Sequence, residues 1–286
     1  MSDNCTVVIN SCDSYGDLWR PFFMLLKDQW NPCPYKIVLN TESKTFSLPG
    51  LDIRAFSLQD PNAEDSWGRR LRETLKRVDT EFVIMLFDDF MLESPVDQAK
   101  IDRCIDWMKK NERIAVFYFS NIPGTNIDDC AYPDFERLPK VKEYKLNSAP
   151  ALWRRERLIS FTGPSDTPWA WEFFGSARTY RTDEEFYCAR IGKEDVFSYR
   201  YDLGGAIHRG KWVYSVIKPV IDRYAIDLDL SIRGVEDETL AAYPHSLKWK
   251  VGFLLTGFRM VGLDAFKFIF LSMKRKLARV FGADEK

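Results

Sequence analysis

Residues 82–92 read FVIMLFDDFML, in which six apolar side chains lead directly into Asp88 and Asp89. A continuous apolar run of this length is typical of a central strand of a parallel sheet, which is buried on both faces. Charged groups rarely stand amid so much hydrophobic sequence unless something compensates the free energy of removing them from water. Two interpretations are open: the pair binds a ligand at the end of the strand, or one carboxylate caps the following turn.

Strand-like and helix-like segments alternate on both sides of this run. The expected strands are residues 6–12, 35–40, 51–58, 82–87 and 114–120, and the expected helices between them are residues 19–30, 67–78 and 96–111. Later in the chain we expect a strand and a short helix within 144–161, a strand at 194–201, and a helix at 212–227 that Pro219 strains. The alternation predicts an α/β fold with a mostly parallel central sheet flanked by helices.

Composition describes an ordinary soluble globular protein. The 286 residues are 45% hydrophobic and 29% charged, and a chain of this length can bury a large core. The six cysteines are scattered without a CxxC pair, so we expect reduced thiols in a cytoplasmic protein. The chain enters a strand pattern almost at once, without a signal peptide, and no stretch of 18 residues is free of charge. A simple membrane span is therefore not expected.

The C-terminal part of the chain is basic and apolar. Residues 245–280 contain eight Lys or Arg residues and one acidic residue, Asp264, whereas the rest of the chain is acidic. This mixture fits an interfacial helix or helix pair that holds the protein on the inner face of the plasma membrane. The alternative is a helical hairpin packed on the body or on a second subunit, so an oligomer stays open. Nucleic acid is not an expected partner, because the body is acidic and carries no nucleic-acid motif.

Polar side chains follow the first two strands. Asn10, Ser11 and Asp13 stand at the end of the first expected strand, and Glu42 follows the second. In an open α/β sheet, ligands bind outside the carboxyl ends of the strands. These residues are therefore candidates for ligand binding, and each is also a candidate for capping a turn.

A helix start adds positive charge to the same edge. Ser66 is a candidate cap for the helix at 67–78, and Arg69 and Arg70 lie in its first turn. An arginine there is within reach of a pyrophosphate, which the helix N-terminus also favours. The alternative is a solvated arginine-rich helix face.

Five short segments together resemble a bacterial polysaccharide-biosynthesis branch of the GT-A-fold glycosyltransferases, of the family 2 type. They are INSCDSYGDLWRPFF (9–23), LNTES (39–43), SWGRRLRETLKRV (66–78), LFDDF (86–90) and RGKW (209–212), and the resemblance covers about residues 5–235. It implies a GT-A domain over residues 1–244, with a nucleotide-sugar-binding half at about 1–121 and an acceptor half at 122–244. A basic amphipathic helical tail follows at 245–286.

The resemblance also implies roles for the residues at the sheet edge. Asn10, Ser11, Asp13 and Glu42 would hold the nucleobase and ribose of a nucleoside-diphosphate sugar, and Arg70 would contact its pyrophosphate. The family's acidic motif is DxD, but position 90 is Phe90. Asp88 is therefore expected at the ribose or base, and Asp89 at a Mn²⁺ or Mg²⁺ ion that shares the phosphates.

Two later segments supply the remaining candidates. Glu172, which follows Trp169 and Trp171, matches the position of the family's catalytic base, with three other carboxylates, Asp166, Asp183 and Glu184, in reserve. Its alternative role is a helix N-terminal charge in a hydrophobic plug. In the glycine-rich segment 204–212, His208 is the candidate second metal ligand, and Arg209 and Lys211 are candidates for the leaving diphosphate.

The function that these observations favour is glycosyl transfer. A sugar would pass from the donor to a hydroxyl of a glycan acceptor, expected to be lipid-linked, in lipopolysaccharide or capsule synthesis. Inversion is preferred because no obvious enzyme nucleophile is present. One alternative is a sugar-nucleotide nucleotidyltransferase, although NSCDSYGD (10–17) lacks the glycine-rich, basic phosphate loop of such enzymes. The other is a non-catalytic glycan-binding protein on the same fold.

Overall fold

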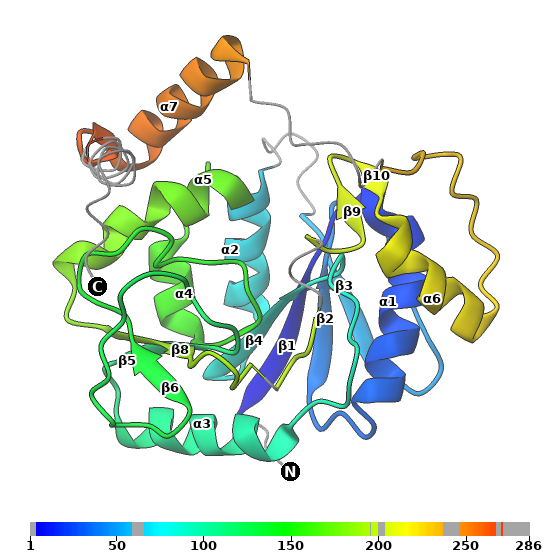
Figure 1. Cartoon of the computed structure of the whole chain (residues 1–286), viewed down its shortest axis with the longest axis horizontal. Helices are drawn as coiled ribbons and strands as arrows, with labels where there is room; N and C mark the ends of the chain where they lie inside the picture. Colours follow the sequence, from blue (N-terminus) through cyan, green and yellow to red (C-terminus); the bar gives the residue numbers. More distant parts are fainter. Residues whose placement is uncertain are drawn as a thin grey trace.

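The computed structural model describes residues 4–58, 66–194, 196–199, 204–236, 246–266 and 270. Its centre is an eight-stranded sheet in the order β3-β2-β1-β4-β7-β5-β8-β6, with helices on both faces (Figure 1). The strands are β1 (Cys5–Asn10), β2 (Lys36–Asn40), β3 (Ile53–Phe56), β4 (Phe82–Phe87), β5 (Ile114–Tyr118), β6 (Phe135–Arg137), β7 (Ala151–Arg154) and β8 (Glu185–Ala189). A small hairpin of β9 (Ile207–His208) and β10 (Lys211–Trp212) stands apart from the sheet.

The helices follow the strands in alternation for most of the chain. They are α1 (Gly16–Gln29), α2 (Trp67–Arg77), α3 (Gln98–Lys110), α4 (Arg155–Phe161), α5 (Pro168–Phe173), α6 (Tyr214–Tyr224) and α7 (Leu247–Val261), with 3-10 turns η1 (Asp13–Tyr15) and η2 (Gly175–Arg181). Strands β1 to β4 pair in parallel, as do β5 and β8, whereas β7 and β6 are antiparallel to their neighbours. The predicted α/β fold with a mostly parallel central sheet flanked by helices is confirmed.

Strand β4 is central because its side chains are apolar on both faces. Phe82, Ile84 and Leu86 point into the core beneath α1, α3 and α6, and Val83 and Met85 into the core beneath α2, α4 and α5. All five are fully buried. Successive side chains of a strand point to opposite faces, so only a continuous apolar run fills both layers.

One predicted strand is wrong. The described part of the segment expected as a strand at 194–201 forms none, although Val196 and Phe197 are buried in the core. An apolar run shows burial, but pairing needs a neighbouring strand with free backbone groups. The helix expected at 212–227 does form as α6, with Pro219 inside it.

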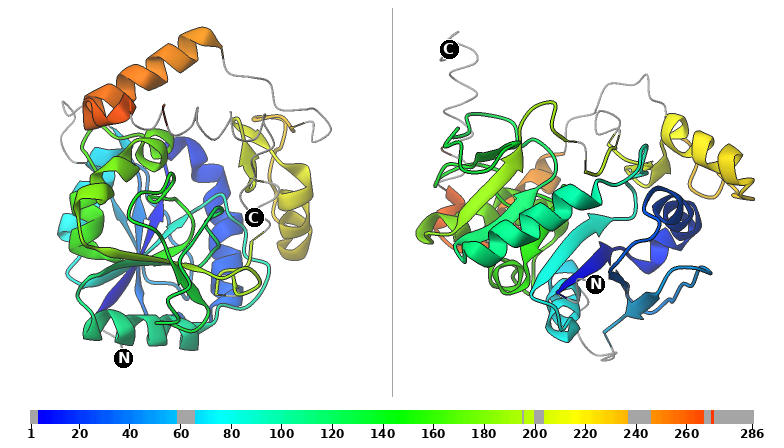
Figure 2. Two further views of the ribbon diagram at one scale, coloured as in Figure 1. Left: turned by 60° about the vertical axis from the view of Figure 1, so that its left-hand side comes forward. Right: turned by 90° about the horizontal axis from the view of Figure 1, so that it is seen from below.

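The tail helix α7 packs on the body of the protein. Phe253, Met260 and Val261 contact a small cluster whose buried members are Ala170, Phe174 and Ala265, from α5, the following turn and the turn after α7. Figure 2 shows α7 lying along one end of the sheet. Among the described helices, none is long and apolar enough to cross a membrane. The division into a domain and a tail remains a prediction.

The start of α2 meets the turn before α5 at very short range. The backbone N–H of Gly68 donates to the carbonyl of Asp166 at 3.0 Å. A Cβ on Gly68 would lie 2.1 Å from the carbonyl oxygen of Gly163. Only a glycine lets the two backbones approach this closely.

We therefore expect Gly68→Ala to destabilise the protein by about 1–3 kcal/mol, since the added methyl must push the two backbones apart. The matched control is Gly252→Ala in α7, where a Cβ would meet nothing within 4 Å. There the ordinary gain in helix propensity of about 1 kcal/mol is expected. Urea denaturation followed by circular dichroism measures both, and equal stability of the two variants would contradict the close approach.

Candidate functional site

The carboxyl ends of β1, β2 and β4 are level with one another. Asn10 pairs in register with Asn40 of β2 and with Phe87 of β4, so the residues that follow these strands share one edge. Asn10 itself is buried, and its Oδ1 accepts from Asn40 Nδ2 at 3.1 Å. Thr74 of α2 bonds to the Asn40 amide oxygen at 3.2 Å. The structure thus places Asn10 inside the sheet edge and leaves the next residues to form its surface.

Asp88 ties three elements together. Its Oδ2 accepts from Ser11 Oγ at 2.5 Å and from Trp19 Nε1 at 3.1 Å, and Trp19 also donates to Ser11 Oγ at 2.6 Å. The residue is 2% exposed. Burial raises its pKa well above the usual range, and the neighbouring Asp89 raises it further. Asp88 is therefore a structural link between β4, β1 and α1, and ligand binding by the DD pair stays a prediction.

Asp89 follows in the same turn and, unlike Asp88, keeps part of its surface exposed. Burial raises the pKa of its carboxyl to about 6, which places its titration close to neutrality. Its backbone carbonyl accepts from Ala206 N at 2.6 Å. A Cβ on Gly205 would lie 2.9 Å from that carbonyl and 3.3 Å from the Asp89 carboxylate, and Gly205 has a φ of +88°. The glycine-rich segment at 204–212 can approach Asp89 because residue 205 has no side chain.

A charged cluster covers the ends of β1 and β2. Arg70 Nη1 lies 2.8 Å from Glu42 Oε1, and Arg70 Nη2 donates to the Ser11 carbonyl at 3.4 Å. Glu42 also accepts from the backbone N–H of Asp13. The Asp13 carboxylate accepts from the backbone N–H groups of Ser43 and Lys44. Ser11, Asp13, Glu42 and Arg70, predicted from separate segments, therefore form one bonded cluster beside Asp88, in which Ser11 and Arg70 are buried.

The β9–β10 hairpin carries the late basic candidates. His208 pairs with Lys211 across the hairpin, and Arg209 adopts a left-handed φ of 52° at its turn. His208 Nδ1 lies 3.1 Å from Glu236 Oε1, an acidic residue that the sequence did not single out. When a carboxylate accepts from Nδ1, the lone pair on Nε2 is left for a metal or a proton.

Arg233 is a further residue that sequence reasoning missed. Its guanidinium lies over the rings of Tyr15 (4.9 Å) and Trp212 (5.4 Å) and donates to Asp17 at 2.6 Å. Burial, followed by the charge of Asp89, raises the pKa of Tyr15 to about 12. Arg233 thus clamps the hairpin onto the start of α1, beside Asp89. Its segment, SIRGVEDE (231–238), has no periodicity that could have identified this contact.

Glu172 lies in α5, which packs on the opposite face of the sheet from the β9–β10 hairpin. Its Oε1 accepts from the Ser148 backbone N–H at 2.7 Å and from the Ser148 hydroxyl. Burial raises the pKa of its carboxyl, and the two bonds from Ser148 oppose that rise. The next residue towards the N-terminus, Trp171, contacts Trp67 at 5.6 Å, and Trp67 stacks on Phe87 at the end of β4. An aromatic chain therefore connects the Glu172 segment to the acidic pair.

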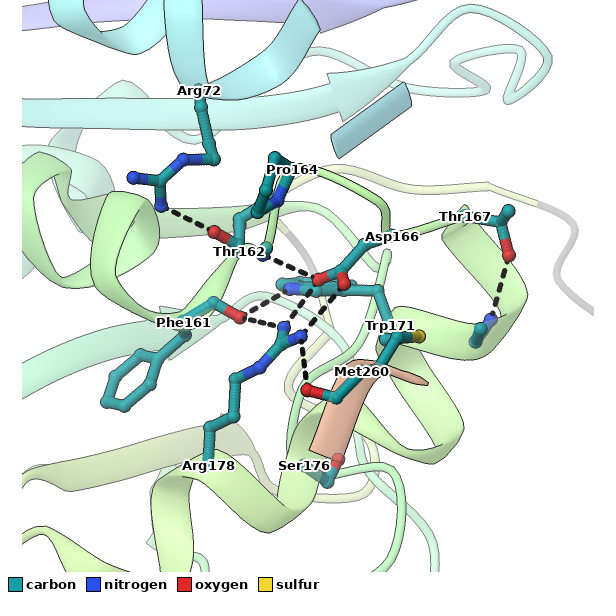
Figure 3. A network of polar contacts seen from close by, with 12 residues as sticks. Arg72, Phe161, Thr162, Pro164, Asp166, Thr167, Trp171, Ser176, Arg178 and Met260 are labelled. Carbon is teal, nitrogen blue, oxygen red and sulfur yellow. Dashed lines mark hydrogen bonds and ion pairs between the residues drawn. The ribbon is translucent and has the colours of Figure 1, made fainter. Parts of the chain in front are cut away.

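The reserve carboxylates are already engaged. Asp166 is fully buried and paired with Arg178, whose Nη2 lies 2.8 Å from Asp166 Oδ1 (Figure 3). Asp183 lies 3.2 Å from Lys140, and Glu184 lies 2.9 Å from Arg157. The side chain of Trp169, near Glu172 in the sequence, is 75% exposed. Of the four carboxylates, Glu172 alone combines burial, a raised pKa and a partner without charge.

The described residues contain no cluster of three or more His, Cys, Asp and Glu side chains that could hold a metal ion. Asp89 is the accessible carboxylate at the strand end, with His208 in the segment that lies against it. Hard divalent ions such as Mg²⁺ often bind one or two carboxylates together with substrate phosphates. The residues present therefore fit an ion that shares the oxygens of a bound diphosphate.

Comparisons with known proteins give distant structural likenesses. No protein-family model matches the chain, and no curated protein matches it. It is similar to residues 1–349 of S. aureus TarS at 11% identity and a TM-score of 0.44, over 93% of this chain and 83% of that one. It is also similar to CMP:2-keto-3-deoxy-manno-octonic acid synthetase complexed with CTP, at 12% identity and a TM-score of 0.35, over 65% and 88% of the two chains. A third is the bifunctional IspDF of Campylobacter jejuni, at 13% identity and a TM-score of 0.39, over 70% and 53%. These likenesses concern the path of the chain alone.

The raised pKa of Asp89 has a consequence for stability. A carboxyl that titrates near 6 when folded and near 3.9 when unfolded binds more protons in the folded state. Its contribution to stability is therefore full below about pH 4 and is lost as pH rises through about 6. Asp89→Asn removes this penalty, and we expect the variant to be about 1–3 kcal/mol more stable than the wild type at pH 8.

The difference should shrink between pH 8 and pH 5, which thermal unfolding at both values measures. Asp106→Asn is the matched control, because this carboxylate of α3 is 66% exposed, and no stabilisation is expected there. A destabilised Asp89→Asn variant at pH 8 would show that the carboxylate is favoured in the folded state after all.

Proposed function

We propose that the protein is a glycosyltransferase that moves a sugar from a nucleoside-diphosphate sugar to a hydroxyl of a glycan, with inversion. The observation that carries the proposal is the pairing of Asp88 and Asp89 at the end of β4. One carboxyl is bonded into the sheet edge, and the other lies against the glycine-rich segment and is partly exposed. Such a division would present the Asp89 carboxylate at the strand end, where open α/β sheets bind ligands.

The donor would lie along the ends of β1, β2 and β4. Ser11, Asp13 and Glu42 would accept from or donate to the nucleobase and ribose, beside the buried Asp88. Arg70, 7% exposed and held by Glu42, would direct its charge at the pyrophosphate. Arg209 and Lys211, on the turn and second strand of the hairpin, would offset the charge of the leaving diphosphate.

Asp89 and His208 are the residues that would hold a Mn²⁺ or Mg²⁺ ion, together with oxygens of the donor diphosphate. The His208–Glu236 contact of 3.1 Å would orient the imidazole with Nε2 outward. When bound, the ion would stabilise negative charge on the leaving group.

Glu172 would activate the acceptor hydroxyl by accepting its proton. A carboxylate whose pKa burial raises is a better proton acceptor near neutral pH than an ordinary exposed one. The two bonds from Ser148 fix its orientation, so that its second oxygen is the one to meet an acceptor hydroxyl. The exposed ring of Trp169 suits stacking on a sugar. The acceptor we propose is a lipid-linked glycan, as in the assembly of lipopolysaccharide or capsule.

The nucleotidyltransferase alternative fits the first turn poorly. Such an enzyme needs backbone N–H groups and cations at the end of β1 to cradle a triphosphate. Here Glu42 accepts from the N–H of Asp13 in that turn, and the Asp13 carboxylate accepts from the N–H groups of Ser43 and Lys44, which follow β2. A triphosphate would meet two negative charges.

Nucleotide binding is tested by thermal shift. We expect UDP or GDP at a hundredfold excess over Kd to stabilise the protein by about 2.7 kcal/mol. Mn²⁺ should bind well only when the diphosphate is present, because the described residues supply at most two protein ligands here. Asp89→Ala should abolish the added shift from Mn²⁺, and Asp106→Ala should leave it intact. An Mn²⁺ shift of equal size without nucleotide, or no nucleotide shift at all, would count against the proposal.

The base is tested with Glu172→Gln, which keeps an oxygen that accepts from Ser148 but cannot take a proton. We expect sugar transfer to fall by about 10²–10⁴-fold while the nucleotide-induced thermal shift is unchanged. Glu184→Gln, at a carboxylate engaged by Arg157, is the control and should retain transfer. If Glu172→Gln lowers nucleotide binding and transfer together, the residue has a structural role instead.

A further inference from the structure

Helix α7 is apolar on two opposite faces, and only one of them is covered. On the inner face Gly257 is buried, and a Cβ there would lie 2.5 Å from the ring of Phe174. Phe253 contacts the same ring at 4.9 Å, and Arg178 donates to the Met260 carbonyl at 3.4 Å, as Figure 3 shows. The helix is thus docked on the body in a defined orientation, which also fixes the direction of its outer face.

The outer face is where a docked surface helix is normally polar. Instead it presents Leu247 (78% exposed), Val251 (50%), Leu254 (40%), Leu255 (56%) and Phe258 (48%). At about 100° per residue these five side chains fall within an arc of about 100° on the side away from Phe253. Past the end of the helix the side chains of Leu263, Phe266 and Phe270 are also exposed, and the Phe266 ring lies 6.3 Å from that of Phe258. A continuous exposed patch of this kind marks an interaction surface.

Cations border this patch on both sides. By the same helical spacing, Lys250 flanks the apolar arc on one side, and Lys248 and Arg259 flank it on the other. The single acidic residue of the segment 245–280, Asp264, lies 2.9 Å from Arg181 of η2, so its charge is offset. The sequence beyond residue 270 adds four more cations before residue 280.

We propose that the outer face of α7 lies flat on an anionic lipid surface, with its apolar side chains among the acyl chains. An apolar stripe bordered by Lys and Arg is the pattern of helices that lie in the plane of a membrane interface. The positive charge beside the apolar face of α7 indicates which partner binds there. Two copies of this face brought together would oppose cations to cations, whereas anionic head groups complement them.

The docking places the site close to the lipid. Helix α7 lies at the end of the molecule towards which β1 runs, the same end that carries the β9–β10 hairpin (Figures 1 and 2). This part of the inference rests on the proposed function: the sugar of a lipid-linked acceptor stays within a short distance of the bilayer surface. An enzyme held by α7 would meet that sugar without lifting the lipid from the membrane.

Sedimentation with vesicles tests the docking directly. The full chain is mixed with vesicles of phosphatidylcholine alone or of phosphatidylcholine and phosphatidylglycerol in equal parts. We expect at least about tenfold tighter binding to the anionic vesicles, weakened by salt. The double variant Leu255→Ser/Phe258→Ser should bind at least about tenfold more weakly than the wild type, since two apolar side chains no longer enter the acyl region. The matched control is Ile191→Ser/Ile232→Ser, which alters two side chains outside α7 that are 85% and 80% exposed. It should bind as the wild type does.

Two results would overturn the inference. One is wild-type binding to anionic vesicles no stronger than that of the Leu255→Ser/Phe258→Ser variant. The other is a dimer, seen by light scattering, that this variant dissociates, since the face would then belong to a second copy of the chain. The nucleotide-induced thermal shift separates the two proposals. If the variant loses vesicle binding but keeps the shift, the result concerns the docking alone. If the wild type shows no shift, the result concerns the proposed function.

Discussion

The carboxyl group of Asp88 is buried at the point where β1, β4 and α1 meet, and it is held there by the hydroxyl of Ser11 and the indole of Trp19. A buried carboxyl is tolerated only when its hydrogen-bonding capacity is met, so these two partners fix the length and direction of the β4 end. Everything around the candidate site depends on that fixed end. Asp89, the next residue of the same turn, is more exposed than Asp88 and lies against the glycine-rich segment.

The second half of the chain is held against this edge by contacts that tolerate little change. Gly68 at the start of α2 touches the turn that precedes α5, and the aromatic series Phe87, Trp67 and Trp171 runs from β4 to α5. The proposed donor and acceptor sides of the site are therefore positioned by packed rings and a backbone contact. Such contacts have a narrow distance range, which suits a reaction that needs two substrates in line.

The glycine-rich segment shows a different kind of constraint. Gly205 lets the backbone of the β9–β10 hairpin approach Asp89, while Arg233 holds the hairpin to Tyr15 and Asp17 at the start of α1. The segment that carries His208, Arg209 and Lys211 is thereby joined to the backbone of Asp89 through Ala206. Helix α7 likewise has one covered and one exposed face. Its inner side chains dock it on the body, and its outer side chains are exposed.

The sequence by itself determined the fold class and most of its elements. The strand at 82–87 and the helix start at Trp67 follow from an apolar run and a capping serine, which are local signals. It also identified Ser11, Asp13, Glu42, Arg70 and the acidic pair as one group, because parallel strands end at a common edge. Only the tertiary structure decided that Asp88 is bonded inward, that Asn10 is buried, that the segment at 194–201 forms no strand in its described part, and that Arg233 and Glu236 join the site. Each of these features depends on partners that are distant in sequence. A pattern along the chain does not show which distant groups will lie close enough to form a bond.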